Sequence, residues 1–98
     1  MLTSKQRAKL RAIVSTMPAT TIVGKDGLTD TVLDQIDKQL YAHEIVKVSV
    51  LESAELSARD YLQEASQKLK AEQVNFIGRK FALYRVSNKK GIKHIAID

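Results

Sequence analysis

The sequence predicts a single α/β domain in which helices and strands follow one another in the order α-β-α-β-α-β-β. Three segments space their apolar residues as amphipathic helices do, and valines alternate with polar residues over 45–51. The closing segment 74–86 has the pattern of two strands joined by a tight turn. Strands joined through a helix should pair in parallel, whereas hairpin strands are antiparallel. We therefore expect a four-stranded mixed sheet with the second and third helices on one face.

The first helix should begin after Thr3, because Thr3 and Gln6 form a capping-box pattern, and it should end at Pro18. Its apolar stripe must be buried, although the sequence does not show where: Leu10, Ile13, Val14 and Met17. The elements that follow are a strand over about 20–23 and helices over about 29–43 and 57–72.

The hairpin is defined by Gly78-Arg79, which suits a two-residue type II′ turn with glycine first. That register would put four apolar side chains on one face: Val74, Phe76, Phe81 and Leu83. Tyr84 would lie on the other face, where it could stack on a base or, as we favour, pack under the first helix. Residues 1–86 form the predicted domain, and 87–98 are a tail that is either frayed or a marginal strand.

The composition indicates a reducing environment, because the chain has no cysteine. There is no apolar run typical of a secretory signal or a membrane span, so we expect a cytoplasmic protein. The net charge of +5 is unevenly distributed. Residues 1–25 carry five bases and no acid, residues 26–72 carry five bases against ten acids, and residues 73–98 carry six bases and one acid. This pattern indicates a polyanion-binding face if the two basic ends meet, and ordinary solvated charge if they do not.

The segment Gly24-Lys25-Asp26-Gly27 lies between the first strand and the second helix. Glycines at both ends allow another backbone to approach closely, and the helix that follows directs its positive dipole end toward the loop. A GXXG loop of this kind binds the backbone of a nucleic acid. The alternative interpretation is a tight turn that needs glycine for a positive φ. Spacing alone does not distinguish the two.

Four separated motifs resemble the YhbY family, the stand-alone bacterial form of the CRM (chloroplast RNA splicing and ribosome maturation) domain. They are LTSKQRAKLRAI, IVGKDGLTD, EIVKVSVLE and IGRKFALYR, in this order within residues 1–86. The resemblance implies a fold similar to the C-terminal domain of translation initiation factor 3, with a GXXG loop like that of KH domains. It also implies RNA binding and an association with precursors of the large ribosomal subunit.

On this resemblance and on charge, we expect RNA to contact the loop, the first helix and the hairpin turn. The predicted RNA-binding residues are Gly24, Lys25, Asp26, Gly27, Lys5, Arg7, Lys9, Arg11, Arg79 and Lys80. Asp26 departs from what a phosphate site needs, so binding at the loop should depend on backbone N–H groups and Lys25.

No catalytic constellation is visible, since there is no cysteine nucleophile and neither histidine adjoins a serine and acid pair. The loop lacks the spacing of a P-loop, and no metal-ligand cluster appears. We expect no enzyme activity, cofactor, metal or small-molecule substrate. The alternative function is a protein-interaction adaptor whose acidic middle region docks a basic partner through Asp34, Asp37 and Glu64.

Overall fold

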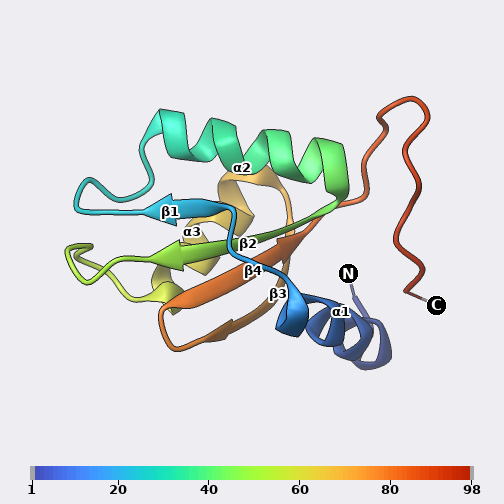
Figure 1. The fold of residues 1–98 in the computed structure, drawn as a ribbon, viewed down its shortest axis with the longest axis horizontal. Helices are drawn as coiled ribbons and strands as arrows, with labels where there is room; N and C mark the ends of the chain where they lie inside the picture. Colours follow the sequence, from blue (N-terminus) through green and yellow to red (C-terminus); the bar gives the residue numbers. More distant parts are fainter. Residues whose placement is uncertain (1, 98) are drawn as a thin grey trace.

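The computed structural model describes residues 2–97, which form three helices and a four-stranded mixed sheet (Figure 1). The elements are α1 (Ser4–Thr16), β1 (Thr21–Val23), α2 (Asp30–His43), β2 (Ile45–Val50), α3 (Ala58–Leu69), β3 (Glu72–Ile77) and β4 (Lys80–Tyr84). The predicted element order and α/β class are confirmed. Helices α2 and α3 cover one face of the sheet and α1 lies on the other (Figure 1).

The strand order is β1-β2-β4-β3, with β1 and β2 parallel and the other two pairs antiparallel. The expectation that the strands on either side of α3 pair directly is wrong, because β4 lies between β2 and β3. The hairpin returns into the gap that the α3 connection leaves open, and β4 becomes a central strand. This insertion buries residues 81–84 of β4.

Helix starts were predicted well, because each is set by a local cap. The side chains of Thr3, Thr29 and Ser57 accept hydrogen bonds from the first turns of α1, α2 and α3. The predicted end of the third helix is wrong. Lys70 adopts the left-handed conformation with φ of 53°, which ends α3 at Leu69 and leaves Glu72 to begin β3.

The hairpin turn has the predicted form, since φ is 57° at Gly78 and is not positive at Arg79. Phe76 faces Phe81 as expected. The placement of Val74 opposite Leu83 is wrong, because a β-bulge shifts the register between residues 73 and 75. The extra residue turns Val74 to the α1 side, where it is buried.

The sheet has a core on each face. Under α2 and α3, Phe81 and Leu83 pack against the apolar sides of both helices and of β2. Under α1, the stripe predicted from sequence packs on Ile45, Val74 and Tyr84. Burial of Tyr84 confirms the packing interpretation and removes this ring as a platform for a base.

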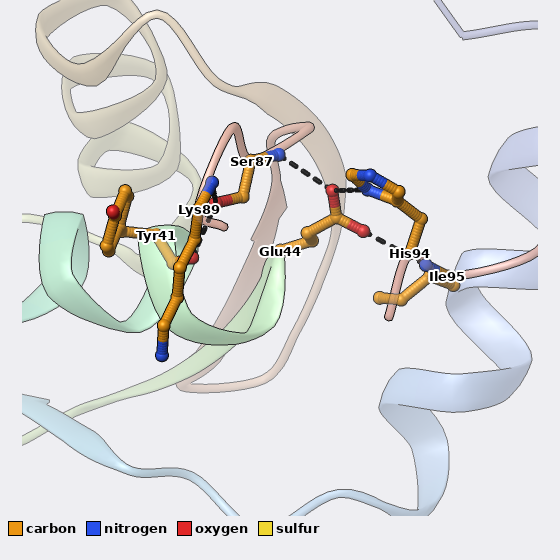
Figure 2. A network of polar contacts seen from close by, with 6 residues as sticks. All are labelled: Tyr41, Glu44, Ser87, Lys89, His94 and Ile95. Carbon is orange, nitrogen blue, oxygen red and sulfur yellow. Dashed lines mark hydrogen bonds and ion pairs between the residues drawn. The ribbon is translucent and has the colours of Figure 1, made fainter. Parts of the chain in front are cut away.

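Residues 85–97 form no helix or strand, and they return along the molecule toward α1 (Figure 1). The fully buried carboxylate of Glu44 holds this segment (Figure 2). It accepts hydrogen bonds from the backbone N–H groups of Ser87 at 2.7 Å and Ile95 at 2.9 Å, and it lies 2.7 Å from Nδ1 of His94. We call these four residues the Glu44 clasp. Through it, Ile95 and Ile97 reach the core under α1.

The clasp should weaken in acid. Burial raises the pKa of the Glu44 carboxyl, but the hydrogen bonds from Ser87, His94 and Ile95 outweigh burial and hold that pKa below its usual 4.5. The clasp therefore contributes its full stability above pH 4.5 and loses it as the pH falls through the lower folded-state value. Thermal unfolding followed from neutral pH to about pH 3 should show this loss, and Glu44→Gln should show a smaller one. Equal pH responses in the two proteins would contradict this assignment.

Candidate nucleic-acid interface

The Gly24–Gly27 loop is a tight turn closed by its own backbone. The Gly27 N–H donates to the Gly24 carbonyl at 3.0 Å, and the Thr29 N–H donates to the Gly27 carbonyl at 3.0 Å. Gly27 has φ of 71°, a left-handed conformation that favours glycine, so the backbone of the turn itself accounts for this residue. Gly24 lies outside the left-handed region, and a Cβ there would meet only Leu51 at 3.7 Å. The turn interpretation therefore accounts for Gly27 and leaves Gly24 unexplained.

The free N–H groups and the positive dipole end at the start of α2 already have some partners within the chain. The Thr29 hydroxyl accepts from the Val32 N–H at 3.2 Å, and Asp30 places a carboxylate in the first turn. On its other side the loop borders a hollow of about 260 Å³ that Glu55 and Glu64 also line. Lys25 is exposed and is the only cation among the residues that line this hollow. The loop thus contributes one positive charge, which lies among carboxylates.

The hairpin turn lies at the same end of the sheet as the Gly24–Gly27 loop, with the β2–α3 connection between them (Figure 1). Arg79 Nη1 donates to the Leu51 carbonyl of that connection at 3.4 Å. A hollow of about 390 Å³ beside Arg79 is lined by Glu52 and Glu55 as well. The expected basic face is therefore interrupted by carboxylates between Lys25 and Arg79.

The four cations of α1 differ in their surroundings. Lys5 and Arg11 are exposed, whereas Arg7 and Lys9 are half-buried. Arg7 Nε donates to the Gln73 carbonyl at 3.2 Å, so this side chain ties α1 to β3. Arg11 lines a hollow between α1 and the sheet.

A hollow of about 470 Å³ lies between α1 and the open part of the sheet. Three cations line it, Arg11 from α1, Lys47 from β2 and Lys80 from β4, and no aspartate or glutamate does. The Lys47 ammonium donates to the carbonyls of Val14 and Met17, each at 3.0 Å, and so holds the C-terminal end of α1. We call this feature the α1 hollow.

Arg11 and Lys80 are predicted site residues that the fold brings together. Sequence reasoning missed Lys47, which was seen only as a polar position in an alternating strand. Its place in the hollow depends on α1 crossing that face, and no local signal gives this.

Within residues 2–97, no group of three or more metal-ligating side chains is close enough to hold an ion. None of the described helices combines the length and apolar character needed to cross a bilayer.

The family model of the CRS1 / YhbY (CRM) domain matches residues 2–85, a range that includes every helix and strand described above. The chain belongs to this family. Its CRM domain is similar to the "Probable RNA-binding protein YqeI" of Bacillus subtilis, with 34% identity over 89 residues, 91% of this chain and 93% of that protein. It is also 30% identical over 92 residues to a protein of Haemophilus influenzae named "RNA-binding protein", covering 94% of this chain and 93% of the other.

The CRM domain also matches the solution structure of the hypothetical protein SAV1595 from Staphylococcus aureus, described as a candidate RNA-binding protein. The TM-score is 0.82, the sequences are 30% identical, and the match covers 100% of both chains.

Proposed function

We propose that this CRM domain binds RNA, with the α1 side of its sheet and the Gly24–Gly27 loop contacting the sugar-phosphate backbone. The observation that carries the proposal is the α1 hollow, where three cations converge and no carboxylate does. Clustered cations neutralise phosphates and release their counterions, which makes such a surface favourable for a polyanion. The names of the two relatives support RNA as that polyanion.

The loop should contribute backbone contact rather than net charge. Gly24 lacks a side chain although its own conformation and surroundings do not require this. A phosphodiester that approaches the loop closely would explain the glycine, with Lys25 as the partner of the phosphate charge. This contact would position the RNA and add affinity, but it would not distinguish one base from another.

We further propose that the RNA belongs to precursors of the large ribosomal subunit, as the resemblance to the YhbY family implies. Crosslinking in cells, followed by sequencing of the bound RNA, tests this step. Enrichment of large-subunit precursor sequences is expected. Enrichment of unrelated transcripts would contradict the ribosomal role while leaving RNA binding intact.

The adaptor alternative is less well supported, because its three acidic residues already have cationic partners. Ion pairs of 2.9 Å join Asp34 to Lys38, Asp37 to Arg85, and Glu64 to Lys68. Arg85 also donates to the carbonyl of Leu69, which makes its pair part of the link between α2 and α3. A basic partner would therefore meet carboxylates whose charge is already partly neutralised within the chain.

A further inference from the structure

Four side chains form a row across the uncovered part of the α1-side face, at the end of the sheet nearest the Gly24–Gly27 loop. The strand registers align Ile22 with Ser49, Ser49 with Lys80, and Lys80 with Ile77. Paired residues on neighbouring strands point to the same face. Burial sets that face, because Thr21 and Val23 on either side of Ile22 are buried and Val23 packs under α2 and α3. We call these four residues the open row.

The open row is apolar at both ends and has the hydroxyl of Ser49 and the ammonium of Lys80 between them. Ile22 is 57% exposed and Ile77 is 73% exposed, although both lie in strands. With strands spaced by about 4.8 Å, the row spans roughly 14 Å. Farther along the same face, α1 covers Ile45 and Tyr84, which are buried. The two isoleucines are therefore uncovered because α1 stops short of them.

The α1 hollow opens directly onto this row, since Lys80 and Ile77 belong to both. The hollow adds an amide from Asn75 and a hydroxyl from Ser15, which line it together with Arg11. An amide can donate and accept hydrogen bonds at once, as base edges require. An exposed apolar side chain, polar groups able to pair with base edges and nearby cations thus occur together at one hollow of about 470 Å³.

We propose that the open row and the α1 hollow form a site for unpaired nucleotides of RNA. One base lies in the hollow against Ile77 with its edge toward Asn75, and the adjoining phosphates face Arg11 and Lys80. Paired bases present only their edges, so the faces that Ile22 and Ile77 can support belong to unpaired residues. This inference rests on the proposed function. It adds that this face of the sheet selects unpaired RNA over paired RNA.

An RNA hairpin with an unpaired loop, carrying a fluorescent adenine analogue in that loop, tests the site against a fully paired RNA duplex. Wild-type protein should bind the hairpin more tightly than the duplex and change the fluorescence of the analogue. Ile77→Ala removes an apolar contact and Asn75→Ala a hydrogen bond, so each should weaken hairpin binding about fivefold and leave duplex binding unchanged. The matched controls are Val86→Ala, at an apolar residue 65% exposed outside the row, and Phe76→Ala, which removes an exposed ring from the hairpin strand on the opposite face.

The possible outcomes distinguish a failure of this site from a failure of the proposed RNA-binding function. If Ile77→Ala lowers the affinities for hairpin and duplex equally, the unpaired-nucleotide site is overturned and RNA binding stands. The same holds if Ile77→Ala changes neither affinity while Lys25→Ala lowers both. Failure of the wild-type protein to bind either RNA would overturn both proposals. Displacement of the hairpin by an acidic peptide, with no fluorescence change on RNA binding, would assign the face to a protein instead. Because Ile77 is 73% exposed, Ile77→Ala should fold normally, and its melting temperature checks this.

Discussion

Replacing Glu44 with alanine should lower the free energy of unfolding by about 2–4 kcal/mol. The carboxylate is fully buried and accepts from two backbone N–H groups, those of Ser87 and Ile95. Alanine would leave both donors without their acceptor and release the segment that brings Ile95 and Ile97 to the core under α1. Denaturant unfolding followed by far-UV circular dichroism measures the difference.

Lys70→Ala is the matched control for this change. Lys70 and Glu44 are the two non-glycine residues with positive φ among those described, at 53° and 68°. Both substitutions place alanine at a left-handed backbone position. Because Lys70 is exposed, Lys70→Ala should lower the free energy of unfolding by no more than about 0.5 kcal/mol. His94→Ala should also be mild, because that side chain is 58% exposed. A Glu44→Ala effect as small as that of Lys70→Ala would mean that the tail is not held by the clasp.

Gly24→Asp should weaken RNA binding by an order of magnitude or more, because it adds both bulk and a negative charge where a phosphodiester is proposed to lie. The fold should persist, since the new Cβ would meet only Leu51 at the ordinary distance of 3.7 Å. Gly24→Ala separates the two causes by adding bulk alone, and we expect a smaller loss. Titration of a labelled RNA hairpin gives the affinities, and the melting temperature reports folding.

Gly27→Asp is a less direct test, although we also expect it to weaken binding. The φ of 71° at Gly27 strains any side chain by about 1 kcal/mol, so lost binding would mix strain with lost contact. If Gly24→Asp binds RNA as well as wild type does, the loop is a turn and not a contact. If it unfolds, the loop matters to the fold in a way that its geometry does not show.

Local signals predicted the parts of this fold that depend on neighbouring residues. The caps at Thr3, Thr29 and Ser57 and the turn at Gly78-Arg79 each involve side chains or dihedrals within a few residues. The insertion of β4 between β2 and β3 depends instead on which strand edges remain unpaired after the chain has folded. Hydrophobic alternation gives the faces of a strand but not its neighbours.

The Glu44 clasp and the α1 hollow were not predictable for the same reason. Glu44 follows His43 at the end of a helix and resembles any solvated charge, while its partner His94 lies 50 residues farther along. Lys47 enters the hollow only because α1 crosses that face. The likeness to the C-terminal domain of translation initiation factor 3 and the RNA contacts of the ten predicted residues stay predictions.

The most direct test of RNA binding through phosphate contacts is the salt dependence of affinity. With about three to five phosphate contacts shared by Lys25, the exposed α1 cations and the cations of the α1 hollow, the logarithm of the association constant should fall linearly against the logarithm of salt concentration, with a slope of roughly −2 to −4. Lys25→Ala should make the slope shallower by about 0.7 to 0.9 and weaken RNAs of different sequence equally. A flat salt response would contradict binding through phosphates. The account would also be contradicted if the protein showed no measurable RNA affinity and instead bound a basic protein, with that binding lost on neutralising Asp34 and Asp37.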